Sequence, residues 1–254
     1  MRKPSGVKEL KYYGIHACLA IGEYRPNDII RVYIDASNVK TFRPILKWCA
    51  ENKKAYHIVT VEELDKVSAS VHHEGICILA RESVPISSEA FFNALSKTLQ
   101  GQCLLYLDGV QNPHNIGSIL RTCAHFGVTY LLGEKGKLPA LSPSACRIAK
   151  GGSEMVRLVE IEKPKVFFSQ LIKRGFSLVS TSSHVSDSLY NCILPEKMIL
   201  AMGSEAEGVS KEVLSLSSKQ IQIPGSGLVE SLNVSVATSL CLGEYFRQHG
   251  GFSC

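Results

Sequence analysis

A serine, an asparagine and a glycine-rich loop mark one stretch of the chain that is well suited to ligand binding. In residues 225–237, GSGLVESLNVSVA, Ser231 and Asn233 stand directly before a long apolar run. Ser and Asn are common first residues of helices, because their side chains accept hydrogen bonds from free N–H groups of the first turn. The stretch follows a short apolar strand, IQIP, which Pro224 ends. A strand, a glycine loop and a helix start leave backbone donors facing outward, so we expect a ligand there.

The type of ligand follows from the neighbouring residues. Gly203 ends another apolar stretch, MILAMG, and Ile223 and Leu232 flank the glycine loop. Open α/β sheets bind ligands outside the carboxyl ends of their strands, where glycines let a ligand approach the backbone. Adenine needs apolar walls and a few backbone hydrogen bonds more than it needs charged side chains. The sequence therefore predicts a nucleoside cofactor held against main-chain groups.

Other glycine-rich and metal-binding sites fit less well. The stretch GSGLVE has Glu230 where a dinucleotide-binding loop has its third glycine, and GSEAEGVS (203–210) has Val209 in place of the phosphate-binding lysine. These differences disfavour a nicotinamide-nucleotide enzyme, a kinase or an NTPase. The nine cysteines include no C-x-x-C pair, and no cluster of metal ligands occurs in the sequence, so no metal is expected.

Composition indicates a soluble globular protein. The chain has 254 residues with 45% hydrophobic and 20% charged side chains, enough for one large or two ordinary domains. No apolar run is long enough to span a membrane, and the basic N-terminus lacks a signal-peptide core. The odd, scattered cysteines suggest reduced thiols and hence a cytoplasmic location. A net charge of +5 is compatible with a polyanionic partner and does not require one.

Hydrophobic periodicity predicts two α/β domains. In the first, strands are expected over 28–35, 55–60 and 75–80, and helices over 41–54 and 61–67. Residues 81–102 look like a linker containing a short helix. In the second, short apolar strands over 103–107, 128–133, 176–183, 198–203 and 221–224 and a helix over 116–127 indicate a parallel sheet covered on both faces. The predicted boundaries are 1–80, 81–102 and 103–254.

Three segments resemble the motifs of a known family. They are LDGVQNPHNIGSILRTCAHFGV (107–128), MILAMGSEAEGVS (198–210) and IQIPGSGLVESLNVSVA (221–237). In this order they resemble the SpoU/TrmH family of the SPOUT superfamily, S-adenosylmethionine-dependent RNA 2′-O-ribose methyltransferases. Residues 1–80, with YYGIHACLAI and VHHEGICILA, resemble that family's small RNA-binding domain of the L30e type. The resemblance implies an α/β fold in which a trefoil-knotted parallel-sheet domain follows a smaller L30e-like domain, and it implies a homodimer.

Position by position, the resemblance also implies a set of site residues. The catalytic set falls on Asn115, Arg121, Glu205, Ser231 and Asn233. The cofactor, S-adenosylmethionine, is expected to contact, largely through backbone atoms, the set Gly203, Gly208, Ile223, Pro224 and Leu232. The sequence departs from the family at Asn112, where an acid is common, and at Gly225, where a methionine is common.

The implied activity is transfer of a methyl group from S-adenosylmethionine to a ribose 2′-hydroxyl of tRNA or rRNA. An in-line displacement of this kind depends mainly on positioning the two reactants. Arg121 could act as the base, or it could remain charged and orient a phosphate, and the sequence leaves both roles open. The alternative is an RNA-binding or ribosome-assembly factor with a catalytically silent knotted domain. Neither the target RNA nor its nucleotide can be read from the sequence.

Overall fold

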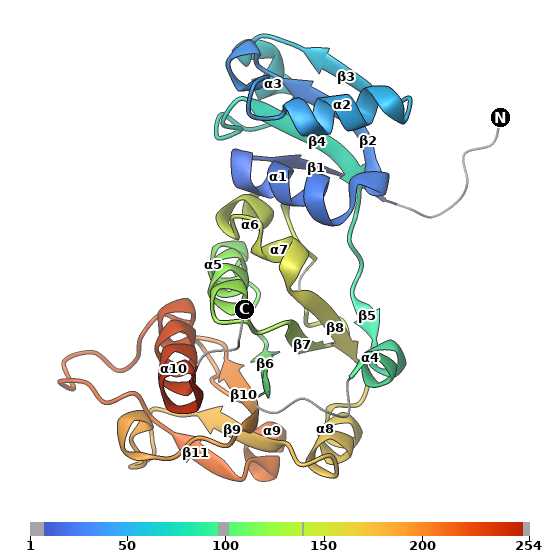
Figure 1. Cartoon of the computed structure of the whole chain (residues 1–254). Helices are drawn as coiled ribbons and strands as arrows, with labels where there is room; N and C mark the ends of the chain where they lie inside the picture. The colour runs from blue at the N-terminus through green and yellow to red at the C-terminus, as the bar shows by residue number, and fades with distance from the viewer. Residues whose placement is uncertain (1–7, 96–101, 139, 251–254) are drawn as a thin grey trace. The chain divides into compact units, whose positions relative to one another are not determined.

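Two β-sheets organise the chain (Figure 1). The computed structural model describes residues 8–95, 102–138 and 140–250. A four-stranded sheet has the strand order β1-β4-β2-β3, and a seven-stranded sheet has the order β11-β9-β10-β6-β7-β8-β5. Packing groups residues 8–84 with Leu141–Met155 into a first unit, and the second unit holds the other described residues from Pro85 onward.

The first unit is a mixed sheet with helices on both faces. Strand β4 runs antiparallel to β1 and β2, and β3 runs parallel to β2. Helix α3 begins with a capping box, in which Thr60 Oγ1 accepts from the Glu63 N–H and the Glu63 carboxylate accepts from the Thr60 N–H. The elements are β1 (Glu9–Tyr13), α1 (Ile15–Tyr24), η1 (Pro26–Asp28), β2 (Ile29–Ile34), η2 (Ala36–Asn38), α2 (Arg43–Glu51), β3 (Ala55–Ile58), α3 (Val61–Ser68) and β4 (Ile76–Arg81). All five elements predicted in this region are confirmed, whereas β1 and α1 were not predicted.

A later segment of the chain packs into the first unit. Helices α6 (Pro143–Ile148) and α7 (Gly152–Met155) lie against α1 and β1. Glu154 accepts hydrogen bonds from the Arg25 guanidinium at 2.5 and 3.1 Å, and that guanidinium also lies over the Tyr12 ring. The side chains are only 14% and 4% exposed, and removing one partner of such a buried pair leaves a costly unpaired charge. This ion pair therefore helps hold the segment in place.

The second unit is an α/β layer structure whose strands are all parallel, as predicted. The short helix expected in residues 81–102 is α4, which follows the edge strand β5. The strands are β5 (Ile86–Ser87), β6 (Gln102–Asp108), β7 (Tyr130–Glu134), β8 (Arg157–Ile161), β9 (Ser177–Thr181), β10 (Lys197–Gly203) and β11 (Lys219–Ile221). The helices are α4 (Ser88–Ala94), α5 (Pro113–His125), α8 (Pro164–Ile172), η3 (Leu189–Asn191), α9 (Lys211–Leu216) and α10 (Val234–His249).

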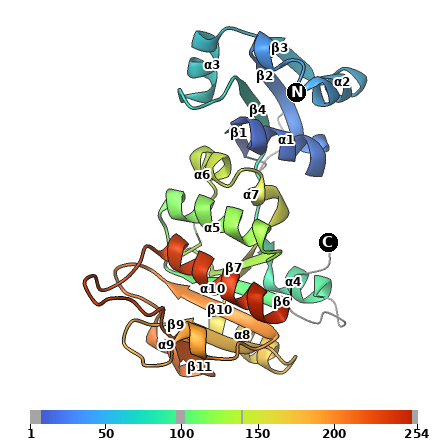
Figure 2. The same cartoon turned by 60° about the vertical axis from the view of Figure 1, so that its left-hand side comes forward.

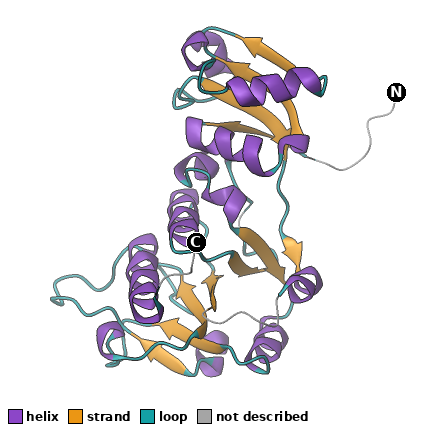
Figure 3. Ribbon diagram, viewed as in Figure 1, coloured by secondary structure: helices purple, strands orange, loops and turns teal. Residues whose placement is uncertain are grey.

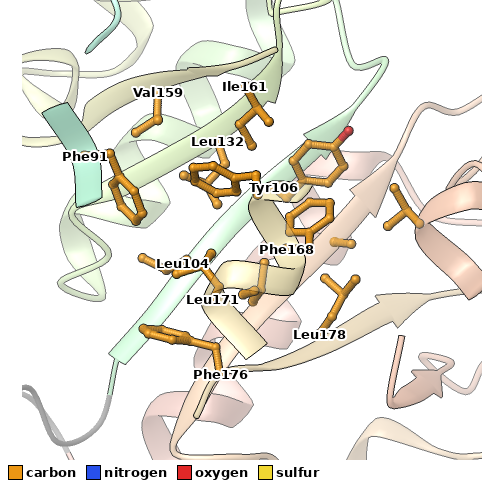
Figure 4. Packing of buried hydrophobic residues seen from close by; sticks show 14 of the residues in the cluster. Phe91, Leu104, Tyr106, Leu132, Val159, Ile161, Phe168, Leu171, Phe176 and Leu178 are labelled. Atoms are coloured by element: carbon orange, nitrogen blue, oxygen red, sulfur yellow. The ribbon is translucent and has the colours of Figure 1, made fainter. Parts of the chain in front are cut away.

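Helices cover both faces of this sheet (Figures 2 and 3). On one face, Leu104 and Tyr106 of β6 pack against Phe168 of α8 and Phe91 of α4 in a large apolar cluster (Figure 4). On the other face lie α5 and α10, whose buried residues include Cys123 and Cys241. Side chains alternate along a strand, so β6 supplies both cores. The prediction of a sheet buried on two sides is confirmed, while the trefoil knot and the homodimer stay predictions.

The buried cysteines of the described residues lack both the exposure and the lowered pKa expected of a nucleophile. The eight cysteines within the described residues are all free, and seven of them are buried. Burial raises the pKa of the Cys241 thiol to about 12 and also raises the pKa of Cys103 and Cys123. Since the thiolate is the reactive form, these buried thiols serve as small apolar core residues.

Candidate active site

The strand order of the seven-stranded sheet changes direction between β6 and β10. From β6 the chain continues through α5 to β7 on one side, whereas β10 pairs with β6 on the other side. Asp108 and Gly203 are register partners at the carboxyl ends of these two strands. A reversal of this kind opens a crevice at the carboxyl edge of a parallel sheet, and ligands of α/β proteins bind there.

Asp108 shapes the turn that follows β10. Its carbonyl oxygen accepts a hydrogen bond from the Ser204 N–H at 3.0 Å, and its Oδ2 accepts from the Ser210 N–H at 2.8 Å. Gly208 closes the turn with its N–H bonded to the Ser204 carbonyl, and its φ of 66° suits a glycine. Sequence reasoning missed Asp108 as a site residue. Its position directly after an apolar strand was the available signal.

Two helix N-termini meet beside this turn. Asn112 caps α5 by accepting from the His114 N–H, and Asn233 caps α10 by accepting from the Ser235 N–H, both at 2.9 Å. The helices lie side by side, with the Thr122 and Ser239 hydroxyls 3.1 Å apart, about 2.5 turns into α5 and about 1.4 turns into α10. Both helices follow parallel strands, so their positive dipole ends point to the same crevice. An anionic group is stabilised at such a place.

Three predicted residues from three distant segments form one hydrogen-bonded network at these helix starts. The Asn115 amide donates to Glu205 Oε1 at 3.0 Å, and the Asn233 amide donates to Glu205 Oε1 and to Asn115 Oδ1, each at 3.0 Å. Asn115 is buried, whereas Glu205 and Asn233 are exposed. Glu205 Oε2 accepts no hydrogen bond from any described residue. The network fixes the carboxylate and leaves this oxygen available to a bound hydroxyl group.

Arg121 lies outside the network. It is on α5, six residues beyond Asn115, which is about 1.7 turns and about 9 Å along the axis. The two residues therefore occupy different faces of the helix, and Arg121 is exposed. Its side chain makes no hydrogen bond or salt bridge to any residue that the structure describes. The guanidinium is consequently free to bind a ligand group at the surface.

The remaining predicted residues lie in or beside the exposed loop between β11 and α10. Strand β11 ends at Ile221, before the expected Pro224, because Gln222 exchanges backbone hydrogen bonds with residues 187–189 instead. Ile223, Pro224, Ser231 and Leu232 therefore all lie outside regular structure. This loop also exposes large apolar side chains, with 89% of Leu228 and 72% of Val229 accessible to solvent. The structure does not bring these residues into hydrogen-bonded contact with the network.

The variant Asn233→Asp tests the hydrogen-bonded network through its effect on the free energy of unfolding. Aspartate caps a helix as well as asparagine does, but it cannot donate to Glu205 and it places a second carboxylate beside the first. We expect a loss of about 1–2 kcal/mol in unfolding free energy at neutral pH, which diminishes in acid as carboxylates become protonated. Asn112→Asp is the matched control, because Asn112 also caps a helix yet makes no bond to Glu205. Equal urea midpoints for the two variants at neutral pH would contradict the network.

The described residues form neither a metal site nor a membrane-spanning helix. No group of three or more His, Cys, Asp or Glu side chains placed to hold a metal ion occurs among residues 8–95, 102–138 and 140–250. Across these same ranges, no helix has the length and hydropathy needed to cross a membrane.

Comparison with known proteins assigns both parts of the chain. The SpoU rRNA Methylase family matches residues 102–243, and the RNA 2′-O ribose methyltransferase substrate binding family matches residues 12–85. YfiF of Escherichia coli O157:H7, named an uncharacterized tRNA/rRNA methyltransferase, is 35% identical over 95% of this chain and 69% of its own length. The 23S rRNA (guanosine-2′-O-)-methyltransferase RlmB of Pasteurella multocida is 33% identical over 93% of this chain and 97% of its own length.

Solved structures agree with the fold. The SpoU methyltransferase AviRb of Streptomyces viridochromogenes, solved in complex with AdoMet, has a TM-score of 0.76 at 18% identity, covering 94% of this chain and 90% of that one. A TrmH/SpoU tRNA modifying enzyme of A. aeolicus has a TM-score of 0.53 at 31% identity, covering 63% of this chain and 83% of that one. With the family match spanning residues 102–243, the chain belongs to the SpoU rRNA methylase family.

Proposed function

We propose that this protein transfers a methyl group from S-adenosylmethionine to a ribose 2′-hydroxyl of tRNA or rRNA. The observation that carries the proposal is the hydrogen-bonded network of Asn115, Glu205 and Asn233 at the carboxyl edge between β6 and β10. The names of relatives such as RlmB support RNA as the substrate and the 2′-hydroxyl as the methyl acceptor.

S-adenosylmethionine supplies a methyl group on a sulfonium centre, and the crevice has features that fit such a cofactor. A Cβ on Gly203 would overlap the backbone of Gly208 and Val209, so main chain packs directly against main chain in the turn beside the proposed cofactor site. Among the described residues, nothing accepts from the Leu232 N–H, and the nearby loop offers the apolar surface that an adenine ring needs. We assign cofactor binding to Gly203, Gly208, Ile223, Pro224 and Leu232.

The acceptor ribose is assigned to the network and to two exposed side chains. Glu205, held by the two asparagine amides, would accept a hydrogen bond from a ribose hydroxyl through Oε2. Ser231 precedes Asn233 by two residues and would contact the same sugar. Arg121 stays charged, since a guanidinium does not lose its proton in proteins, and it would bind the adjacent phosphate and stabilise the developing alkoxide.

We also propose the larger organisation that the resemblance implies. Residues 1–80 would bind RNA, 81–102 would link the domains, and 103–254 would form a knotted methyltransferase domain that dimerises. The family matches over 12–85 and 102–243 support this division. Packing adds one qualification, because residues 141–155 belong to the first unit in the structure although they lie within the methylase match.

The proposal predicts which bond in RNA becomes protected. Purified protein should transfer label from methyl-labelled S-adenosylmethionine to tRNA or rRNA extracted from a strain that lacks this gene. A ribose methyl group removes the hydroxyl that attacks the next phosphate, so the modified position should resist alkaline cleavage. Mapping alkali-resistant linkages across both RNA classes identifies the nucleotide.

Each result has a distinct meaning. Label in an alkali-resistant dinucleotide supports the proposal. Label released as an ordinary mononucleotide would indicate base methylation and contradict the 2′-hydroxyl assignment. RNA binding without cofactor binding by titration calorimetry would favour the alternative, an assembly factor with a silent methylase domain.

A further inference from the structure

One face of the first unit's sheet carries exposed aromatic and basic side chains that the proposed chemistry does not use. The register places alternate residues of the four strands on this face, and α3 covers only one end of it, through Leu64 packed against Tyr13 and Cys77. On the other face, Val32 and Ile34 of β2 are fully buried. The rest of this face, here called the open face, consists of the exposed Lys11, Arg31, Ala55 and His57 and of the half-buried Leu79 and Tyr33, the last of which packs against the edge of the Leu64 cluster.

The aromatic residues of the open face are already stacked. The Tyr33 and His57 rings, from neighbouring strands, lie 5.4 Å apart between centroids with an interplanar angle of 23°. The Arg31 guanidinium donates a hydrogen bond to the Tyr33 hydroxyl at 3.2 Å, which restrains the tyrosine ring. His57 lies on the edge strand β3 and is exposed. The pair therefore presents a preformed ring to solvent.

The charges on this face suit a polyanion. Lys11 and Arg31 are both exposed, and Leu79 lies between them in the register. The same side of the sheet also includes Glu9 and Arg81 at the end of the β1–β4 pair, whose charges offset each other. The aliphatic residues of the open face are the half-buried Leu79 and the small Ala55, so the surface lacks the large apolar core that a protein partner would need. Basic side chains beside stacked rings are typical of sites for single-stranded nucleic acid.

We infer that a single-stranded segment of RNA binds across the open face, with an unpaired base stacked against His57 and phosphates beside Lys11 and Arg31. This inference rests on the proposed RNA-modifying function and names the surface that would bind its substrate. Sequence-specific RNA recognition targets unpaired bases, because duplex RNA hides base faces within the stack. The open face should therefore prefer single strands to duplexes of the same sequence.

Fluorescence anisotropy tests the stacking with a labelled single-stranded RNA of mixed sequence, about 12 nucleotides long. In the full-length protein, His57→Ala should weaken binding by about 10-fold, the expected effect of losing one base–aromatic stack. Tyr33→Ala should weaken binding as well, because it removes the ring on which His57 is stacked. The matched control is Tyr56→Ala, since Tyr56 is next to His57 on β3, is 42% exposed and points to the opposite face. It should leave the affinity unchanged. His57 is exposed on an edge strand, so His57→Ala tests the idea even if Tyr33→Ala destabilises the fold.

Salt dependence separates the phosphate contacts from the stack. Arg31→Ala and Lys11→Ala should each reduce the slope of log affinity against log salt by about 0.7, because each removes one counterion-releasing contact with a single strand. His57→Ala should lower the affinity and leave that slope unchanged. A duplex of the same sequence should bind more weakly and should not respond to His57→Ala.

The outcomes distinguish this inference from the proposed function. Unchanged RNA affinity in the His57→Ala and Tyr33→Ala proteins would overturn the inference, even if the wild-type protein methylates cellular RNA normally. If those variants instead change the oligomeric state in sedimentation and not the RNA affinity, the open face is a protein interface and the inference is wrong. If the wild-type protein transfers no methyl group to RNA, the proposed function is contradicted. The comparison of RNA affinity between the wild type and the variants would still test the inference.

Discussion

Arg121→Ala should lower the rate of methyl transfer by about 100- to 1,000-fold while the affinity for S-adenosylmethionine stays close to that of the wild type. Arg121 is exposed and its side chain makes no hydrogen bond or salt bridge to any described residue, so its removal costs little stability. The loss would arise because Arg121 stabilises charge that develops in the transition state. Single-turnover transfer and cofactor titration measure the two effects separately.

Two further variants sharpen this test. Arg121→Lys should also be slow, because a compact ammonium group cannot reproduce the planar fork of a guanidinium on a phosphate. Arg157→Ala is the matched control for loss of one exposed positive charge, since Arg157 lies on β8, away from the β6–β10 crevice. An Arg121→Ala protein with full activity would refute the catalytic assignment. Loss of cofactor binding with the fold intact would place Arg121 in the cofactor site.

Local sequence patterns are sufficient to predict strands that end at a distinctive residue. Strands such as β6 and β10 are continuous apolar runs ended by Asp108 and Gly203, and both ends were visible in the sequence. By contrast, β1 and α1 are separated only by Gly14, whose φ is 93°, so a strand and a helix follow each other without a loop. Short-range periodicity does not resolve so abrupt a change.

The site shows a similar division. Motif resemblance identified Asn115, Glu205 and Asn233, and the structure joins them although 90 and 118 residues separate the bonded pairs. The role of Asp108 was not predicted, because its bonds to Ser204 and Ser210 exist only once β6 and β10 are adjacent. Strand order depends on residues that are far apart in the sequence, so the residues of β6 alone do not predict which strand will pair with it.

Gly203→Ala should weaken S-adenosylmethionine binding by about 10- to 100-fold, the second large effect that we expect. A methyl group at this position would overlap the backbone of Gly208 and Val209, and a backbone cannot rotate aside as a flexible side chain can. Overpacking of this kind typically costs about 1–3 kcal/mol. The turn after β10 would have to move away from Asp108, and with it the wall of the proposed cofactor site and Glu205.

Control variants decide whether the lower cofactor affinity of Gly203→Ala comes from a change in the cofactor site or from a general loss of stability. Gly243→Ala is matched, because Gly243 lies in α10 and its added methyl group would meet only the Phe126 ring at an ordinary 3.6 Å. It should keep cofactor affinity and gain up to about 1 kcal/mol of stability from improved helix propensity. If Gly203→Ala is too unstable to titrate, Gly208→Ala gives a milder test, since nothing lies within 4 Å of its added methyl group and only the φ of 66° is strained. A folded Gly203→Ala protein with wild-type affinity would show that the cofactor does not bind against this turn, because no arrangement of residues 203–209 could accept the methyl group and keep its present path.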